Sequence, residues 1–306
     1  MPLTFGERLE RGFKYLIMNL IEEIKESFKE GSALTRLIHI NLGLFLLIRI
    51  VNVFYFLAGA EFPFLDWLAL PADFHTLASR PWTLITYMFL HFDFLHILFN
   101  VLWLYWMGQI FLGYFDQGKL IAVYLLGGIT GGLFYVIGYN SFPVFSQIVS
   151  DSRLLGASAS VIAIVTALAV HAPNHSIHLM FVGPVKMKYI ALVSVLLYVI
   201  GISSTNTGGN LAHLGGAFWG VAYIALLRKG NDPGKGINWL LNGLKKLFTP
   251  KPKVKISYRK PVNDIEYNRL KNQEQVRINE ILEKISKSGY GSLSKEEKEI
   301  LFRMGK

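Results

Sequence analysis

The sequence predicts an all-α, polytopic membrane protein with six transmembrane helices. Hydrophobic residues make up 52% of the 306 residues, charged residues make up only 17%, and the mean hydropathy is +0.37. Average soluble domains carry about 25% charged residues, so a purely soluble protein is not expected. Six mostly apolar segments approach the roughly 20 residues that a bilayer-spanning helix needs. They lie at about residues 37–60, 94–115, 118–139, 154–171, 187–204 and 208–227.

Residues 1–36 precede the first span and predict an amphipathic segment on the cytoplasmic membrane surface. Apolar side chains recur there at helical spacing among acids and bases, which is typical of a helix lying in the membrane interface. These side chains are Phe5, Leu9, Phe13, Ile17, Ile21, Ile24 and Phe28. Glutamates interrupt the segment, so a signal peptide is not predicted.

The loop of residues 61–81 joins the first two spans and is more apolar than a free loop. It contains Trp67, Leu70 and Phe74, and Trp82 follows it directly. Tryptophan is enriched at membrane–water interfaces. We therefore expect this loop to fold half-sunk in the outer interface.

Two further segments follow the six-span domain of residues 37–228. Residues 229–263 are rich in lysine and contain four prolines, a composition that predicts a basic linker. Residues 264–306 predict a small cytoplasmic helical hairpin. Ser294, with Glu297 three residues later, forms a capping box that would begin its second helix.

The distribution of basic residues predicts that both termini are cytoplasmic. With the N-terminus inside, 28 of the 31 Lys and Arg residues lie on inner segments, as the positive-inside rule requires. The whole net charge of +10 belongs to residues 228–306. A basic tail beside a membrane domain favours contact with anionic lipid. No aromatic–basic interleaving accompanies it, so no nucleic-acid partner is expected.

Three groups of polar residues interrupt the spans, where polar side chains are costly enough to suggest function. His91, His96 and Asn100 lie near the start of the second span, Ser158 near the start of the fourth, and His213 near the start of the sixth. All three spans run from outside to inside. At 1.5 Å rise per residue, Ser158 and His213 would each lie about 5–10 Å below the outer surface. Three separate segments therefore bring these groups to one depth.

The chemistry that this set suggests is acyl transfer. A serine hydroxyl is a weak nucleophile and needs a neighbouring base. His213 would take the proton of Ser158 and return it to the leaving amine. The tetrahedral intermediate needs hydrogen-bond donors for its oxyanion. His96 and Asn100 are four residues apart, hence on one helix face, and would form that site with the Ser158 backbone N–H.

Three glycines would support this arrangement. Gly156, two residues before the serine, permits a close backbone approach. Gly216 and Gly220 form a pair of small residues that would let the sixth span pack tightly on the fourth. Such packing would bring His213 within reach of Ser158.

Each of these residues also has a structural alternative. Ser158 alone would be an ordinary small residue where two helices pack. His213 would bond a neighbouring carbonyl, and His96 with Asn100 would join two helices by hydrogen bonds. His91 lies nearest the membrane surface and is expected to be structural.

No metal or organic cofactor is predicted. The chain has no cysteine, which excludes thiolate nucleophiles and Cys-based metal sites. His171, His175 and His178 have a spacing that suits one helix face, but Pro173 interrupts that helix and the group lies far from Ser158. A metal site at these histidines is therefore not expected.

Three motifs carry a resemblance to a known family. They are H-x4-H-x3-N at His91 to Asn100, G-x-S at Gly156 to Ser158, and A-H-x-x-G-x-x-x-G at Ala212 to Gly220. Together they resemble the rhomboid family of intramembrane serine proteases, in the bacterial form with six transmembrane helices and a short C-terminal helical extension. The resemblance covers about residues 37–228. Trp82 in the outer loop also fits the pattern of this family.

The resemblance implies a catalytic dyad of Ser158 and His213, with an oxyanion site from His96 and Asn100. It also implies cleavage of transmembrane substrates near the outer face, after a small residue. The sequence departs from the family at Ile162, where well-known rhomboids have a tyrosine that stacks on the catalytic histidine. This departure bears on the orientation of His213.

We therefore predict an intramembrane serine endopeptidase that cleaves transmembrane or juxtamembrane segments of membrane proteins in a bacterial plasma membrane. The substrate helix would be unwound at the site, because a regular helix hides its scissile carbonyls. One alternative is a rhomboid-like protein that binds transmembrane helices without cleaving them. A transporter, the other alternative, would have polar residues reaching the membrane midplane. The oligomeric state is left open.

Overall fold

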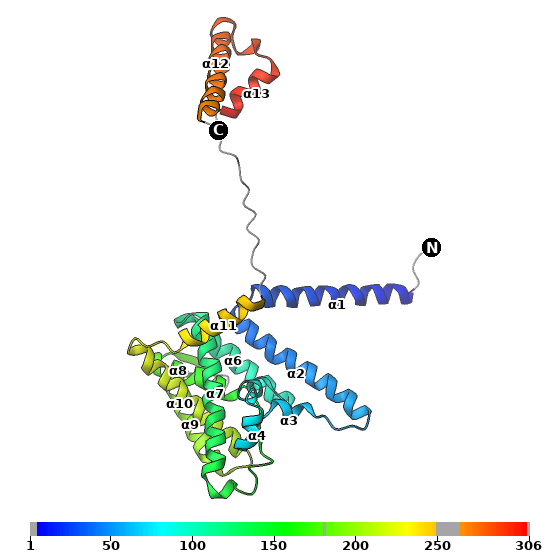
Figure 1. The fold of residues 1–306 in the computed structure, drawn as a ribbon, viewed down its shortest axis with the longest axis vertical. Coiled ribbons are helices and arrows are strands. Elements are labelled where there is room, and N and C mark those ends of the chain that lie inside the picture. The colour runs from blue at the N-terminus through cyan, green and yellow to red at the C-terminus, as the bar shows by residue number, and fades with distance from the viewer. Residues whose placement is uncertain (1–4, 180–181, 249–263, 305–306) are drawn as a thin grey trace. The chain divides into compact units, whose positions relative to one another are not determined.

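The computed structural model describes residues 5–179, 182–248 and 264–304. The chain forms two compact units, Met1–Thr249 and Pro250–Lys306. Helices make up most of both units, and two short antiparallel strand pairs accompany them in the first (Figure 1). The predicted helical fold class is confirmed.

Six helices of the N-terminal unit correspond to the six predicted spans. They are α2 (Ala33–Leu57), α6 (Phe94–Tyr114), α7 (Gln117–Ser141), α8 (Ser158–His171), α9 (Met187–Ile200) and α10 (Thr207–Arg228). Among the described helices, α2, α6, α7 and α10 are long and apolar enough to cross a membrane, whereas α8 and α9 are shorter apolar helices.

The fourth predicted span begins later than expected. α8 begins at Ser158 rather than at residue 154, and Arg153–Leu154 instead form strand β2, antiparallel to β1 (Leu70–Pro71). Gly156 separates β2 from α8 with a φ of +125°, which is not helical and which glycine adopts most readily. The 14 residues of α8 rise about 21 Å. α8 is therefore shorter than the hydrocarbon core of a bilayer, which is about 30 Å thick.

The centre of the unit is the contact of α7, α8 and α10. Every residue of α8 from Ala159 to Leu168 is buried. A Cβ atom at Gly216 of α10 would overlap the carbonyl oxygen of Ala159, and one at Gly220 would overlap that of Ala163. The two glycines therefore lie where α10 approaches α8 most closely, as the sequence suggests.

The remaining long helices surround this centre. α2 contacts α6 and α7, and its buried residues lie between Ala33 and Ile48. Its last residues, including Phe54, Phe56 and Leu57, are exposed. Figure 1 shows this end of α2 leaning away from the bundle. α9 packs against α8 and α10.

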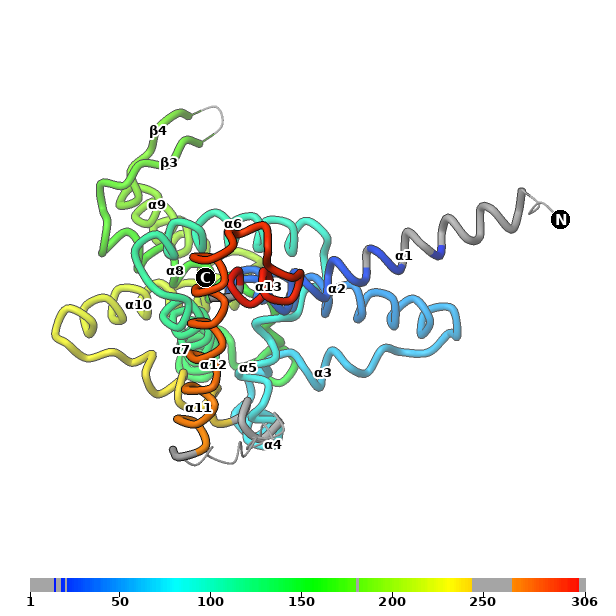
Figure 2. The backbone as a smooth tube through the Cα atoms, turned by 90° about the horizontal axis from the view of Figure 1, so that it is seen from above, coloured from blue at the N-terminus to red at the C-terminus, as the bar shows by residue number. Residues whose placement is uncertain are grey.

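The loop between α2 and α6 is folded into short elements (Figure 2). They are α3 (Phe64–Leu68), β1, α4 (Phe74–Ser79), α5 (Thr83–Thr86) and the 3-10 turn η1 (Tyr87–Phe89). Trp82 stacks on Trp67 with ring centroids 6.1 Å apart, and its Nε1 donates a hydrogen bond to the Trp67 carbonyl over 2.8 Å. Trp82 therefore holds this loop together and is not among the residues that line the cavities at Ser158.

Helix α1 (Phe5–Glu30) forms where the amphipathic N-terminal segment is predicted. Its side chains Ile21, Ile24 and Phe28 are exposed, as expected of a helix that lies on a surface. The side chains of Phe5, Leu9, Phe13 and Ile17 lie outside the described residues.

The predicted linker over residues 229–263 is wrong for the stretch that forms α11 (Gly234–Phe248). Ile237 packs against the hydrophobic core, while Trp239 and Leu240 are exposed. The apolar residues of this stretch recur at helical spacing between glycines and lysines, which gives an amphipathic helix that packs on α7. The prolines Pro250, Pro252 and Pro261 lie outside the described residues.

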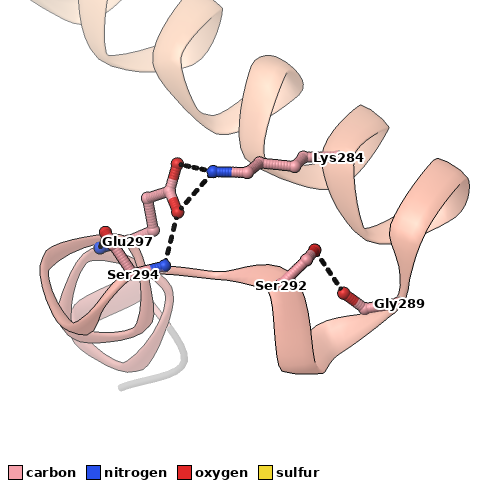
Figure 3. A network of polar contacts seen from close by, with 5 residues as sticks. All are labelled: Lys284, Gly289, Ser292, Ser294 and Glu297. Carbon is pink, nitrogen blue, oxygen red and sulfur yellow. Dashed lines mark hydrogen bonds and ion pairs between the residues drawn. The ribbon is translucent and has the colours of Figure 1, made fainter.

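A helical hairpin makes up the described part of the C-terminal unit. It contains α12 (Asp264–Ser288), a 3-10 turn at Tyr290–Ser292 and α13 (Lys295–Met304). The predicted capping box is present (Figure 3), because the Glu297 N–H donates to Ser294 Oγ over 3.2 Å and the Ser294 N–H donates to Glu297 Oε2 over 2.7 Å. Lys284 Nζ of α12 also donates to the Glu297 carboxylate over 2.9 Å, which ties α12 to α13.

Candidate active site

Ser158 and His213 meet at the contact between α8 and α10. His213 Nε2 lies 2.6 Å from Ser158 Oγ, within hydrogen-bond distance. Ser158 is the first residue of α8 and His213 lies in the first half of α10. The two residues are 55 positions apart in the chain, so the close packing of α10 on α8 is what brings them together.

The backbone just before Ser158 is held by two hydrogen bonds and passes close to the His96 ring. The Gly156 N–H donates to the Tyr87 carbonyl over 2.9 Å. The Ala157 N–H donates to His91 Nε2 over 3.3 Å. A Cβ atom at Gly156 would lie 2.7 Å from Cε1 of His96, which is closer than real Cβ contacts come. Gly156 therefore permits the His96 ring to lie against this loop.

His91 takes a structural position. It is 2% exposed, and its ring lies 5.1 Å from that of His96 in an edge-on arrangement. Its Nε2 accepts the Ala157 N–H. His91 therefore supports the loop that carries Ser158, and it is not among the residues that line the cavities there.

The two residues predicted for the oxyanion site both lie near Ser158 but line different sets of cavities. His96 lines both cavities described below, whereas Asn100 lines only the apolar one. Asn100 Nδ2 donates to the His96 carbonyl over 2.9 Å, which fixes the amide one helical turn from the His96 ring. Both side chains share the apolar cavity with Ser158.

The start of α8 provides the backbone N–H of Ser158, which the sequence analysis expects at the oxyanion site, and the N–H groups that follow it. The first N–H groups of a helix have no partner within it and point out of its N-terminus, where the helix dipole is positive. Because α8 begins at Ser158, its free N–H groups lie directly beside the hydroxyl. This end of α8 suits a developing negative charge.

Two cavities reach Ser158. One has a volume of about 590 Å³ and is lined by polar groups that include His96, Arg153, Asn206 and His213. The other has a volume of about 360 Å³ and lies between α6, α8 and α9, where apolar side chains line it. They are Leu95, Phe99, Trp103, Val161, Ile162 and Val165. The serine therefore faces a polar space on one side and an apolar space on the other.

Tyr198 of α9 is a residue of this site that sequence reasoning missed. Its ring centroid lies 4.4 Å from that of His213, with the two planes tilted by 57°. Tyr198 also lines the apolar cavity. Its position near the C-terminal end of the predicted fifth span, at the depth expected for Ser158, was the available signal.

Ile162 of α8 lies beside α10, the helix that carries His213. It is 5% exposed, and its Cγ2 would lie 2.9 Å from a Cβ at Gly216. The aliphatic side chain therefore fills the contact between α8 and α10. The aromatic ring that contacts His213 is that of Tyr198 on α9, and not a side chain at position 162.

The histidines at the other end of α8 make separate contacts. Tyr114 lies between two of them: its hydroxyl is 3.0 Å from His175 Nδ1, and its ring is 5.3 Å from that of His171. His178 lies on strand β3 (Ser176–Leu179), which pairs with β4 (Gly183–Lys186). In the ranges that the structure describes, no three His, Asp or Glu side chains form a group able to hold a metal ion.

Comparison with known proteins identifies the family. Residues 78–230, half of the chain, match the Rhomboid domain. The chain belongs to the rhomboid family. A curated relative is the RHOMBOID-like protein 12, mitochondrial, of Arabidopsis thaliana, which is 27% identical over 229 residues. That match covers 72% of this chain and 63% of the relative, so this chain spans less than two thirds of the relative's length.

The C-terminal unit has a match of its own. Residues 263–306 match a family of unknown function, DUF6576. Rhomboid membership, together with the apolar helices of the first unit, makes this chain an integral membrane protein with a helical, polytopic bundle.

Proposed function

We propose that this rhomboid is an intramembrane serine endopeptidase. The observation that carries the proposal is the 2.6 Å contact between His213 Nε2 and Ser158 Oγ, at a point where two cavities meet. A serine is activated when a neighbouring base can remove its proton. Membership of a family that consists largely of serine proteases supports the same function.

The proposed reaction has two steps. Ser158 Oγ attacks the scissile carbonyl while His213 Nε2 takes its proton, and the protonated imidazole then gives that proton to the leaving amine. This leaves an acyl group on Ser158 and releases one peptide with a new amino terminus. A water molecule then attacks the acyl carbon while His213 Nε2 takes its proton. The bond between the acyl carbon and Ser158 Oγ breaks, His213 returns the proton to Ser158 Oγ, and the second peptide leaves as a carboxylic acid.

The oxyanion of each tetrahedral intermediate needs donors. The N–H groups at the start of α8, including that of Ser158, supply backbone donors and a positive dipole end. His96 and Asn100 add side chains that share the apolar cavity with Ser158. Together these groups form the proposed oxyanion site.

The two cavities suggest how substrate and water reach the serine separately. The apolar cavity between α6, α8 and α9 suits a segment of a transmembrane helix, unwound at the scissile bond because a regular helix hides its carbonyls. The polar cavity suits water. We propose transmembrane or juxtamembrane segments as substrates, with a small residue before the scissile bond.

We also propose that the N- and C-termini are cytoplasmic and that the membrane is a bacterial plasma membrane. The excess of Lys and Arg on the inner segments supports this orientation. The site then opens toward the outer face, and the basic residues after α10 contact anionic lipid.

A rhomboid-like protein that binds transmembrane helices without cleaving them is the second candidate. Two observations favour it. Ile162 occupies the position of the family's stacking tyrosine, and within the described residues His213 Nδ1 has no hydrogen-bond partner. Both concern how firmly His213 is held as a base.

Labelling with a fluorophosphonate probe, which reacts with activated serines, separates the two candidates without a known substrate. The purified protein in detergent should be labelled, and Ser158→Ala and His213→Ala should each abolish labelling. Ser160→Ala is the matched control, because Ser160 lies buried on the same helix, with its Oγ 3.9 Å from Met88 Sδ. Labelling of the folded wild-type protein at a rate no greater than that of Ser158→Ala would contradict the protease and favour the helix-binding protein.

A further inference from the structure

We propose that Tyr198 is a positioning residue of the site: its ring, supplied by α9, holds the His213 imidazole with Nε2 on Ser158. This inference rests on the proposed function of the Ser158 and His213 pair. It is carried by the 4.4 Å distance between the two ring centroids. It also gives α9 a part in the chemistry, although both members of the pair belong to other helices.

The His213 ring needs an element that fixes its orientation. In a triad, a third polar residue bonds Nδ1 and holds the imidazole in the correct tautomer and orientation. Within the described residues, Nδ1 of His213 is buried and has no hydrogen-bond partner. The single described hydrogen bond of the ring is therefore the one to Ser158, and packing must supply the rest of its orientation.

Tyr198 has the geometry for this packing. Tilted aromatic pairs are favourable with centroids about 4.5–7 Å apart, and the 4.4 Å of this pair is slightly closer than that range. At this centroid distance the tyrosine ring leaves little room for the imidazole to turn out of its present plane. The contact therefore disfavours orientations in which Nε2 turns away from Ser158.

Other neighbours do not offer an equivalent contact. Ile162 of α8 fills the space against Gly216 and has no ring. On α9, Leu197 and Val199 beside Tyr198 are exposed. Ser194, one turn earlier, lines the apolar cavity together with Tyr198, but its hydroxyl donates to the Ile190 carbonyl over 2.8 Å.

The test compares three variants of the full chain by the rate of fluorophosphonate labelling. Tyr198→Leu removes the ring while keeping an apolar side chain, and Tyr198→Phe keeps the ring. Tyr189→Leu is the matched control, because it makes the same substitution at an exposed tyrosine of the same helix. Gel filtration and thermal unfolding in detergent establish that each variant is folded.

Labelling over a range of probe concentrations separates reaction from binding. Loss of the ring should lower the maximal labelling rate about fivefold or more, because a misaligned base reacts slowly even when the probe is bound. The probe concentration that gives half the maximal rate should change by less than about twofold. Tyr198→Phe and Tyr189→Leu should both retain the wild-type rate. A maximal rate in Tyr198→Leu equal to that of the wild type would overturn the proposal.

A second readout does not depend on activity. Nitrogen-15 NMR of the histidine rings, with the His213 signals assigned by their loss in His213→Ala, reports the tautomer and mobility of the imidazole. Tyr198→Leu should shift and broaden these signals, whereas Tyr198→Phe should preserve them. Unchanged signals in Tyr198→Leu would overturn the proposal even if no variant reacts with the probe. Failure of wild-type labelling, by contrast, bears on the proposed protease and not on the ring contact.

Discussion

At the scale of single residues, the loop before Ser158 depends on one glycine. Gly156 combines a φ of +125° with a close approach to the His96 ring, and its N–H is bonded to the Tyr87 carbonyl. Any other residue would meet both a strained backbone and a steric overlap. The position of the serine hydroxyl is therefore tied to the absence of a side chain two residues earlier.

Gly156→Ala should lower the labelling rate of Ser158 at least tenfold and the free energy of unfolding by about 1–3 kcal/mol, through backbone strain and the overlap with His96. Gly183→Ala is the matched control. Gly183 also has a positive φ, of +88°, but no described atom lies within 4 Å of the new methyl group. It should lose stability through backbone strain alone and keep the wild-type labelling rate. Equal labelling rates for the two variants would contradict this role of Gly156.

At the scale of elements, the contact between α8 and α10 sets the distance between Ser158 and His213. Gly220 lies two turns after His213 and faces Ala163 and Thr166 of α8. Small residues allow two helix backbones to approach this closely. A larger residue at Gly220 would separate the helices and draw His213 away from the serine.

Gly220→Val should therefore reduce both stability and reactivity. Overpacking a helix contact typically costs about 1–3 kcal/mol, and we expect a value near the upper end because backbone atoms cannot move aside. Gly113→Val makes the same change in α6 where no described atom lies within 4 Å. Thermal unfolding in detergent should show a clear loss for Gly220→Val and little change for Gly113→Val. A Gly220→Val protein as stable and reactive as the wild type would show that close approach is not required.

The hairpin of the C-terminal unit depends on an ionised Glu297. The hydrogen bond from Lys284 and the bond from the Ser294 N–H lower the pKa of Glu297 below its usual value of 4.5. A carboxyl whose pKa is lowered by folding stabilises the folded state above its unfolded pKa, and this stabilisation is lost as the pH falls through the folded pKa. Protonation of Glu297 should therefore loosen the contact between α12 and α13.

Amide hydrogen exchange of α13 tests this dependence. Protection should be constant above about pH 5 and should fall below pH 4.5. Glu297→Gln should lower protection at neutral pH and remove its dependence on Glu297 ionisation. Glu299→Gln, at an exposed position of the same helix, should behave like the wild type. Identical exchange in the two variants would show that the capping box does not hold this hairpin.

At the scale of the whole molecule, all residues of the proposed site belong to the N-terminal unit. The C-terminal unit, by its separate family match, is a distinct module. Deletion of residues 250–306 should therefore leave labelling of Ser158 within about twofold of the wild-type rate. The measurement is the rate of fluorophosphonate labelling of the truncated protein in detergent. A truncated protein that is folded but unreactive would mean that the second unit takes part in the chemistry.

Hydropathy and helix direction account for much of what the sequence predicts. Spans that run in the same direction place residues equally far from their first residues at one depth, which is why Ser158 and His213 were expected at the same depth. The close packing expected of Gly216 and Gly220 was then predicted to bring His213 within reach of Ser158. Their side chains are 2.6 Å apart. The capping box was also predictable, because its hydrogen bonds are local.

The features that sequence reasoning missed depend on tertiary contacts. Tyr198 was missed because α9 is apolar on most sides, so the face that meets α10 is decided by packing and not by a local pattern. The late start of α8 follows from the conformation of Gly156 and its bond to Tyr87. The helix α11 was hidden by the glycines and lysines of residues 229–263, which have the composition of a linker.

The measurement that tests the central claim most directly is cleavage in a membrane. The protein should be reconstituted in liposomes with a panel of single-span membrane proteins, and new amino termini identified by mass spectrometry. We predict cuts in the outer third of the transmembrane segment, after small residues, that are lost in both Ser158→Ala and His213→Ala and retained in Ser160→Ala. Cuts that persist in Ser158→Ala would contradict the account. So would the absence of cuts in every member of the panel when the wild-type protein is folded.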